Sequence, residues 1–178
     1  MQKFFSLSKI FIAITKVINL IRSIFPLLLV IALTFALALS PPDYLQGDSV
    51  RIMYVHVPSA WISLITFSTI TFLSIINFIF KIKIFEIVII CAAPIGLLFT
   101  CLAIITGSLW AEPTWGTWWV WDARLTSMIV LMTFYVLIIL SHKFIKPRDR
   151  SIKYSSILAI LGSINIPVIK YSVDWWNT

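Results

Sequence analysis

Aromatic residues gather in one short segment of this sequence, WGTWWVWDARLTS, at residues 115–127. Four of the chain's eight tryptophans fall within seven residues there, namely Trp115, Trp118, Trp119 and Trp121. Indole rings are broad and rigid, and they pack against large aromatic ligands by offset stacking or edge-to-face contact. Asp122 and Arg124 follow at once, and an arginine pairs with carboxylates through a two-pronged contact. The segment therefore predicts a site for a flat, apolar ligand with acidic edges, a description that haem fits.

Haem also needs an axial ligand to its iron, and imidazole is the commonest such ligand. The chain has two histidines, His56 and His142. The topology given below places them on opposite sides of a bilayer, about 30 Å apart, so they cannot ligate one iron. His56 is the candidate ligand, because it lies on the same side as the tryptophans. His142 is assigned to a basic cluster, and Arg51 or Arg124 is expected to neutralise the acidic edges.

The composition indicates that lipid surrounds most of the elements that position these residues. The chain has 178 residues, of which 60% are hydrophobic and 12% are charged. Its mean hydropathy is +1.00. Soluble domains have roughly 25% charged residues, so a soluble protein of this size would leave too much apolar surface in water.

Five nearly uncharged stretches predict an all-α integral membrane protein with one membrane domain, residues 1–178. A helical span takes about 20 residues, and backbone groups in lipid must be paired within the segment. The predicted spans are residues 24–40, 54–80, 86–108, 125–141 and 154–170, with a tryptophan-rich outer loop at 110–124. Residues 4–21 look amphipathic and are expected to form an interfacial helix. A signal peptide cleaved near ALALS, residues 36–40, is the alternative, and an uncleaved first span is favoured.

The placement of basic residues predicts the orientation of these spans. With the N-terminus in the cytoplasm, eleven of the fourteen bases lie on the inner side. They are Lys3, Lys9, Lys16, Arg22, Lys81, Lys83, Lys143, Lys146, Arg148, Arg150 and Lys153. Because cytoplasmic loops carry an excess of lysine and arginine, the tryptophan-rich loop is expected outside. That side is the periplasm of a bacterium or, as the alternative, the intermembrane space of a mitochondrion.

Several functional classes lack their signatures in the sequence. There is no GxxxxGK[ST] motif for an ATPase, no HExxH or Cys/His cluster for zinc, and no CxxCH motif. Proton-coupled transporters usually have carboxylates within their spans, and only Glu86 lies near one here. No enzymatic activity is expected from this chain.

The tryptophan segment resembles the "WWD" signature of the haem-handling proteins of cytochrome c assembly. Within that family, three stretches are similar to the haem exporter protein C (CcmC) group. They are RIMYVHVPSAW at residues 51–61, the stretch from APIGLLF to WDARLTS at 93–127, and NIPVIKYSVDWWNT at 165–178. The resemblance covers residues 41–178.

This resemblance implies a six-span inner-membrane protein that holds haem b non-covalently on the outer face and helps load it onto a haem chaperone, CcmE. It also implies an ABC transporter (CcmA and CcmB) and a small membrane subunit (CcmD) as partners. His56 inherits the role of first axial ligand, and the platform for haem corresponds to Trp115, Trp118, Trp119, Trp121 and Asp122. The second axial histidine and sixth span of the family follow the WWNT segment, so we expect a C-terminally truncated chain.

Two other functions remain open on the sequence alone. The chain could be a transporter subunit for haem or another solute, because hydroxyl residues crowd the second span: Ser63, Thr66, Ser68, Thr69, Thr71 and Ser74. Such hydroxyls also bond their own helix or a neighbour. Alternatively, the chain could be a structural membrane subunit whose tryptophans dock partner proteins.

Overall fold

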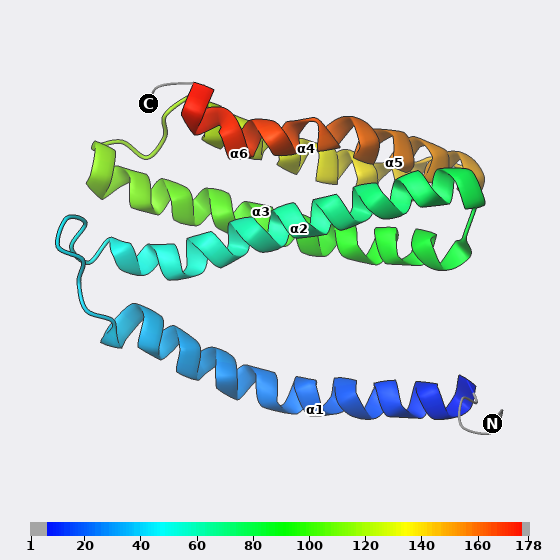
Figure 1. Ribbon diagram of the computed structural model, residues 1–178, viewed down its shortest axis with the longest axis horizontal. Helices are drawn as coiled ribbons and strands as arrows, with labels where there is room; N and C mark the ends of the chain where they lie inside the picture. Colours follow the sequence, from blue (N-terminus) through cyan, green and yellow to red (C-terminus); the bar gives the residue numbers. More distant parts are fainter. Residues whose placement is uncertain (1–6, 176–178) are drawn as a thin grey trace. The chain divides into compact units, whose positions relative to one another are not determined.

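Five helices in the structure are long and apolar enough to cross a membrane. They are Phe11–Leu39, Val50–Phe80, Lys83–Trp115, Ala123–Phe144 and Arg148–Tyr171. The structure is a computed structural model that describes the backbone of residues 7–175 and the side chains of residues 11–171 (Figure 1). The all-α membrane fold expected from the composition is confirmed. The side chain of Trp175 and the whole of Trp176 lie outside the described part.

The first helix forms a unit of its own. Helix α1 (Leu7–Thr34) is followed directly by η1 (Phe35–Leu39), a π-helical turn. The interfacial helix expected over residues 4–21 is therefore not a separate element, which corrects the sequence-based prediction. No glycine separates the two segments, and Ser23 bonds back to the carbonyl of Asn19 at 3.0 Å within the helix. Pro26, near the start of the predicted span, lies inside α1 and does not end the helix.

The second unit is a bundle of five helices (Figure 1). Helices α2 (Val50–Phe80) and α3 (Lys83–Trp115) are antiparallel, followed by α4 (Ala123–Phe144), α5 (Arg148–Ser163) and α6 (Asn165–Trp175). Helix α2 packs on α3 and α5, and α4 packs on α3, α5 and α6. Only Ile164 separates α5 from α6, so these two helices together make one span that begins six residues before the predicted start.

The connections at the two ends of α3 depend on left-handed residues. Lys81 ends α2 with φ 53°, and its N–H donates to the Asn77 carbonyl at 2.9 Å. Gly116 ends α3 with φ 72°, a conformation that suits glycine. Asp122 then caps α4, because its Oδ1 accepts the N–H of Leu125 at 2.7 Å. Helix α3 therefore extends into the outer loop expected at residues 110–124. Residues 116–122 connect it to α4.

Polar contacts hold the middle of the bundle together. The Tyr135 hydroxyl donates to the Ser63 carbonyl at 2.7 Å, and the Ser63 hydroxyl lies 2.6 Å from that of Thr100. The Tyr135 ring also meets Phe67 edge to face, with centroids 5.0 Å apart. All four side chains are fully buried. Hydrogen bonds of this kind join helices in lipid, where apolar surface gives little drive for association.

The hydroxyl residues of the second span serve helix packing. Ser68 and Thr69 bond carbonyls one turn earlier in α2, each at 2.8 Å. Ser63 contacts α3 as described, and Thr71 donates to the Ala159 carbonyl of α5 at 3.0 Å. Four of the six hydroxyls named for a solute pathway therefore bond their own helix or a neighbouring one, whereas the buried Oγ of Ser74 has no hydrogen-bond partner among the described residues.

Candidate functional site

His56 lies in the second turn of α2 and points toward α3. Its Nδ1 is 3.1 Å from the hydroxyl oxygen of Thr106. That hydroxyl donates its single proton to the Leu102 carbonyl at 2.6 Å, so toward the imidazole it acts as an acceptor. In the arrangement where the hydroxyl keeps its bond to Leu102, Nδ1 carries the ring proton and the lone pair is on Nε2. A neutral imidazole held through one nitrogen in this way can bind a metal through the other.

Gly107 allows α3 to approach this imidazole closely. A Cβ atom at position 107 would lie 3.0 Å from Cε1 of His56 and 3.4 Å from its Nδ1. Even a methyl group would therefore press on the ring. The glycine is buried inside the helix and lies against the ligand candidate.

A cavity of about 280 Å³ opens beside His56. It is bounded by α2, by the last three turns of α3, by the start of α4 and by Ile169 of α6. Its lining is Met53, His56, Ala60, Leu64, Ala103, Ile104, Gly107, Trp110, Trp115, Asp122, Arg124, Leu125, Met128 and Ile169. The surface is mostly apolar, with one imidazole, one carboxylate and one guanidinium. This combination suits a large apolar ligand held by a few polar groups.

Two indoles line the cavity at the end of α3. The rings of Trp110 and Trp115 meet edge to face, with centroids 5.3 Å apart. The indole nitrogen of Trp110 donates to Oε1 of Gln46 at 3.1 Å. Gln46 belongs to a turn in which Oδ1 of Asp43 accepts two backbone N–H groups, those of Gln46 and Leu45, both at 2.9 Å. These bonds hold the pKa of Asp43 below its usual value.

The other three tryptophans lie outside the cavity lining. Trp118 and Trp121 are 58% and 76% exposed, in the connection between α3 and α4. Trp119 packs edge to face against Trp121, with centroids 5.6 Å apart. The indole N–H of Trp119 is buried and has no hydrogen-bond partner. The tryptophan segment thus divides into a cavity-lining part and an exposed part.

The three charged residues predicted for the site do not all lie at the cavity. Asp122 is buried, and besides capping α4 it forms an ion pair with Arg124, whose Nε lies 3.4 Å from Oδ2. The side chain of Arg124 is 41% exposed at the cavity. Arg51 is not among the lining residues, and its guanidinium pairs with Asp48 at 3.3 Å. The structure therefore brings His56, Trp115, Asp122 and Arg124 together and leaves Arg51 apart.

Sequence reasoning missed Met53, Thr106, Gly107, Trp110 and Met128. One signal was available for the α2 members, since Met53, Ala60 and Leu64 recur with His56 at helical spacing. No comparable signal marked Thr106, because its role depends on the register between two helices. Within the described residues, no group of three or more His, Cys, Asp or Glu side chains could hold a metal ion by itself.

His142 lies at the other end of the bundle. Its Nδ1 is 2.9 Å from the hydroxyl of Ser151, which joins α4 to α5. The two histidines therefore occupy different sites, and only His56 shares a cavity with tryptophan.

Comparisons with known proteins indicate the family of this chain. The family model of CcmC, Heme exporter protein C, matches residues 1–178. Heme exporter protein C of Bradyrhizobium diazoefficiens is 40% identical over 169 residues, 94% of this chain and 64% of that protein. The protein of the same name from Escherichia coli K12 is 45% identical over 140 residues, 78% of this chain and 57% of that protein.

A mitochondrial relative is similar over a comparable length. The ccmC-like mitochondrial protein of cytochrome c biosynthesis from Marchantia polymorpha is 42% identical over 147 residues, 83% of this chain and 62% of that protein. The chain spans about three-fifths of the length of these relatives. The match of the family model along the whole sequence shows that this chain belongs to the Heme exporter protein C (CcmC) family.

Proposed function

We propose that this chain holds haem at the tryptophan end of its helical bundle as cargo for cytochrome c assembly. The observation that carries the proposal is the cavity shared by the oriented imidazole of His56 and the indoles of Trp110 and Trp115. The imidazole supplies one axial ligand to iron, and the indoles cover part of the porphyrin face. The names of the relatives, which refer to haem export and cytochrome c biosynthesis, support the same cargo.

The dimensions of the site favour loose, reversible holding. A cavity of about 280 Å³ is smaller than the roughly 300–1,000 Å³ of sites that enclose drug-sized ligands. A cavity of this size can enclose one edge of the porphyrin and leaves the rest of the ring accessible to a partner. Arg124 lies at the cavity with part of its guanidinium exposed, where it can neutralise a propionate. The chain has no CxxCH motif, which fits non-covalent binding of haem b.

Transfer to a haem chaperone requires a face that a partner can reach. Trp118 and Trp121 supply exposed indoles next to the cavity, and we assign to them the docking of CcmE. The transporter subunits CcmA and CcmB and the small subunit CcmD are the further partners that membership of the family suggests. Docking through these rings is therefore part of the haem-holding function.

The excess of lysine and arginine at the opposite end of the bundle supports an orientation with the tryptophans outside. We assign the chain to the inner membrane, with its N-terminus in the cytoplasm and residues 116–122 in the periplasm. The relative from Marchantia makes a mitochondrial inner membrane the alternative.

A haem titration of the purified chain in detergent tests the division of the tryptophans. Trp115→Ala is expected to weaken binding about tenfold, since a well-packed aromatic contact is worth about 0.5–1.5 kcal/mol beyond its buried area. Trp118→Ala is expected to bind haem almost normally but to transfer it poorly to CcmE. The matched control is Trp61→Ala, an exposed indole of α2 outside the cavity. Equal haem affinity in Trp115→Ala and the parent chain would favour a docking role for the whole segment.

A second variant tests the orienting hydroxyl. Thr106→Val keeps the shape of the side chain and removes the acceptor for the His56 Nδ1–H. Loss of such an outer contact typically weakens metal binding 10–100-fold, so a change of about that size is expected in the haem titration. Thr106→Ser should retain near-parental affinity. If Val and Ser variants bind haem equally well, the hydroxyl does not orient the ligand.

A further inference from the structure

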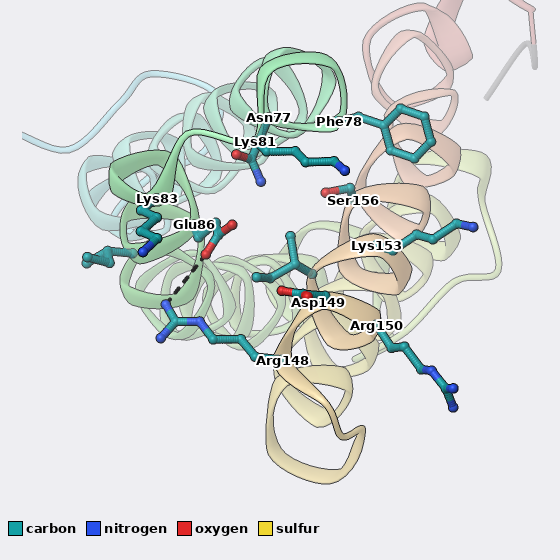
Figure 2. A pocket seen from close by; sticks show the side chains of 12 residues that line it. Asn77, Phe78, Lys81, Lys83, Glu86, Arg148, Asp149, Arg150, Lys153 and Ser156 are labelled. Carbon is teal, nitrogen blue, oxygen red and sulfur yellow. Dashed lines mark ion pairs between the residues drawn. The ribbon is translucent and has the colours of Figure 1, made fainter.

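A larger cavity, of about 830 Å³, lies at the end of the bundle opposite the tryptophans (Figure 2). It is formed where α2 ends and where α3 and α5 begin. Asn77 comes from α2, and Lys81 follows directly after that helix. Lys83 and Glu86 come from α3, and much of the remaining wall comes from residues 148–156. Its residues flank the apolar spans, so the cavity lies at the depth of lipid headgroups.

The lining carries an excess of positive charge. The bases are Lys81, Lys83, Arg148, Arg150 and Lys153, and the acids are Glu86 and Asp149. Glu86 is already paired, since its carboxylate lies 3.6 Å from the Arg148 guanidinium, as the dashed line in Figure 2 marks. The net charge of this wall therefore favours an anion, although its two carboxylates work against a highly charged one.

Two helix N-termini strengthen this preference. Helix α3 begins at Lys83 and α5 at Arg148, and neither has a side-chain cap. The first N–H groups of a helix lack partners within it and carry a partial positive charge. Phosphate groups are commonly bound at such positions. The two helices, with 33 and 16 residues, are long enough to show this effect.

The cavity wall also has buried polar atoms without partners. Asn77 is 2% exposed and Ser156 is 1% exposed, and they come from α2 and α5. Oδ1 of Asn77 and Oγ of Ser156 form no hydrogen bond with any residue that the structure describes. Figure 2 shows both side chains among those that line the cavity. Buried polar groups without a partner are rare because their burial is costly, so these atoms point to a ligand with hydroxyl donors.

Apolar residues complete the lining on the side that meets lipid. Phe78 and Ile87 line the cavity and are 53% and 49% exposed. A ligand that contacts them has an apolar portion in addition to its anionic group. A soluble anion such as inorganic phosphate has no such portion.

We infer that this cavity binds the headgroup of an anionic phospholipid, of the phosphatidylglycerol or cardiolipin type. Lys81 and the N-termini of α3 and α5 hold the phosphodiester, and Asn77 and Ser156 bond the glycerol hydroxyl. The acyl chains leave along Phe78 and Ile87 into the bilayer. Basic pockets between membrane helices on the cytoplasmic side bind such headgroups, and each nearby base contributes about 1 kcal/mol.

The test measures the melting temperature of the full chain in detergent against added lipid. Dioleoyl phosphatidylglycerol and cardiolipin are expected to raise it with a saturable dependence, whereas dioleoyl phosphatidylcholine and sodium phosphate are not. Lys81→Gly removes the ammonium but suits the left-handed backbone, so the turn is retained. This variant should bind about fivefold more weakly. Asn77→Leu removes the unpaired amide, so its melting temperature without lipid should stay equal or rise while its affinity for phosphatidylglycerol falls severalfold.

Lys146→Ala is the matched control, because Lys146 is an exposed base of the same end that does not line the cavity. It should respond to phosphatidylglycerol like the parent chain. Parental affinity in both Lys81→Gly and Asn77→Leu would overturn the site. An equal shift with sodium phosphate would overturn the lipid assignment, and an equal shift with phosphatidylcholine would show that the headgroup is not recognised.

Discussion

His56→Ala is expected to lower haem affinity more than about a hundredfold and to remove the bound Soret band. Loss of an outer contact to a metal ligand typically costs 10–100-fold in affinity, and loss of the ligand itself exceeds that. The indoles that remain contact only the porphyrin. The measurement is a haem titration in detergent, followed by its visible spectrum.

Two controls make this result specific. His142→Ala removes the imidazole bonded to Ser151 at the other end of the bundle and should leave the spectrum unchanged. Free imidazole added to His56→Ala should restore part of the band, because the deleted side chain leaves space beside Gly107. A parental spectrum in His56→Ala, or equal losses in both histidine variants, would contradict the assignment of the ligand.

Gly96→Ala is expected to be the most damaging small change in the bundle. A Cβ atom at position 96 would overlap the ring and hydroxyl of Tyr135. Tyr135 is fully buried and donates to the Ser63 carbonyl at 2.7 Å, so it cannot move without losing that bond. Overpacking costs about 1–3 kcal/mol and an unpaired buried carbonyl about 1–3 kcal/mol more. For a chain of this length, we expect the melting temperature in detergent to fall by about 5–15 °C.

The direction in which Gly96→Ala changes the melting temperature distinguishes an effect of packing from an effect of helix propensity. Glycine to alanine inside a helix would by itself stabilise by about 1 kcal/mol. The double variant Gly96→Ala, Tyr135→Leu should be less unstable than the sum of the two single changes, because the clash is gone. Leu98→Ala, on the exposed side of the same helix, should change the melting temperature little. A melting temperature for Gly96→Ala at or above the parental value would show that α3 and α4 are less closely packed here.

The membrane architecture could be predicted because it depends on local composition. Apolar runs free of charge and the need to pair the backbone in lipid specify helices without any tertiary information. The same local reasoning placed His56 and Trp115 at one end of the bundle, and the cavity brings them together.

The length of α3 beyond the predicted span, residues 86–108, could not be predicted. Gly107 lies near the end of that span, yet it packs against His56, and the helix continues to Trp115. Two further turns of helix place Trp110 and Trp115 at the cavity and leave Trp118 and Trp121 in the exposed connection. Gly116, with φ 72°, is the glycine that ends the helix.

The polar details of both cavities depend on helix register. The contact of Thr106 with His56 joins residues fifty positions apart. Asn77 and Ser156 meet a common cavity only because α2 packs on α5. A single sequence shows which residues share one face of a helix, but it does not show which faces of two helices pack together.

The most direct test of the central claim is a pulsed electron paramagnetic resonance spectrum of the ferric haem complex after labelling with ¹⁵N-histidine. The chain has two histidines, so His142→Gln leaves one labelled imidazole, provided that the affinity tag contains no histidine. Our account predicts a ¹⁵N hyperfine coupling from His56 in addition to the ¹⁴N couplings of the porphyrin. A spectrum with porphyrin ¹⁴N couplings alone would show that haem binds this chain without the imidazole of residue 56.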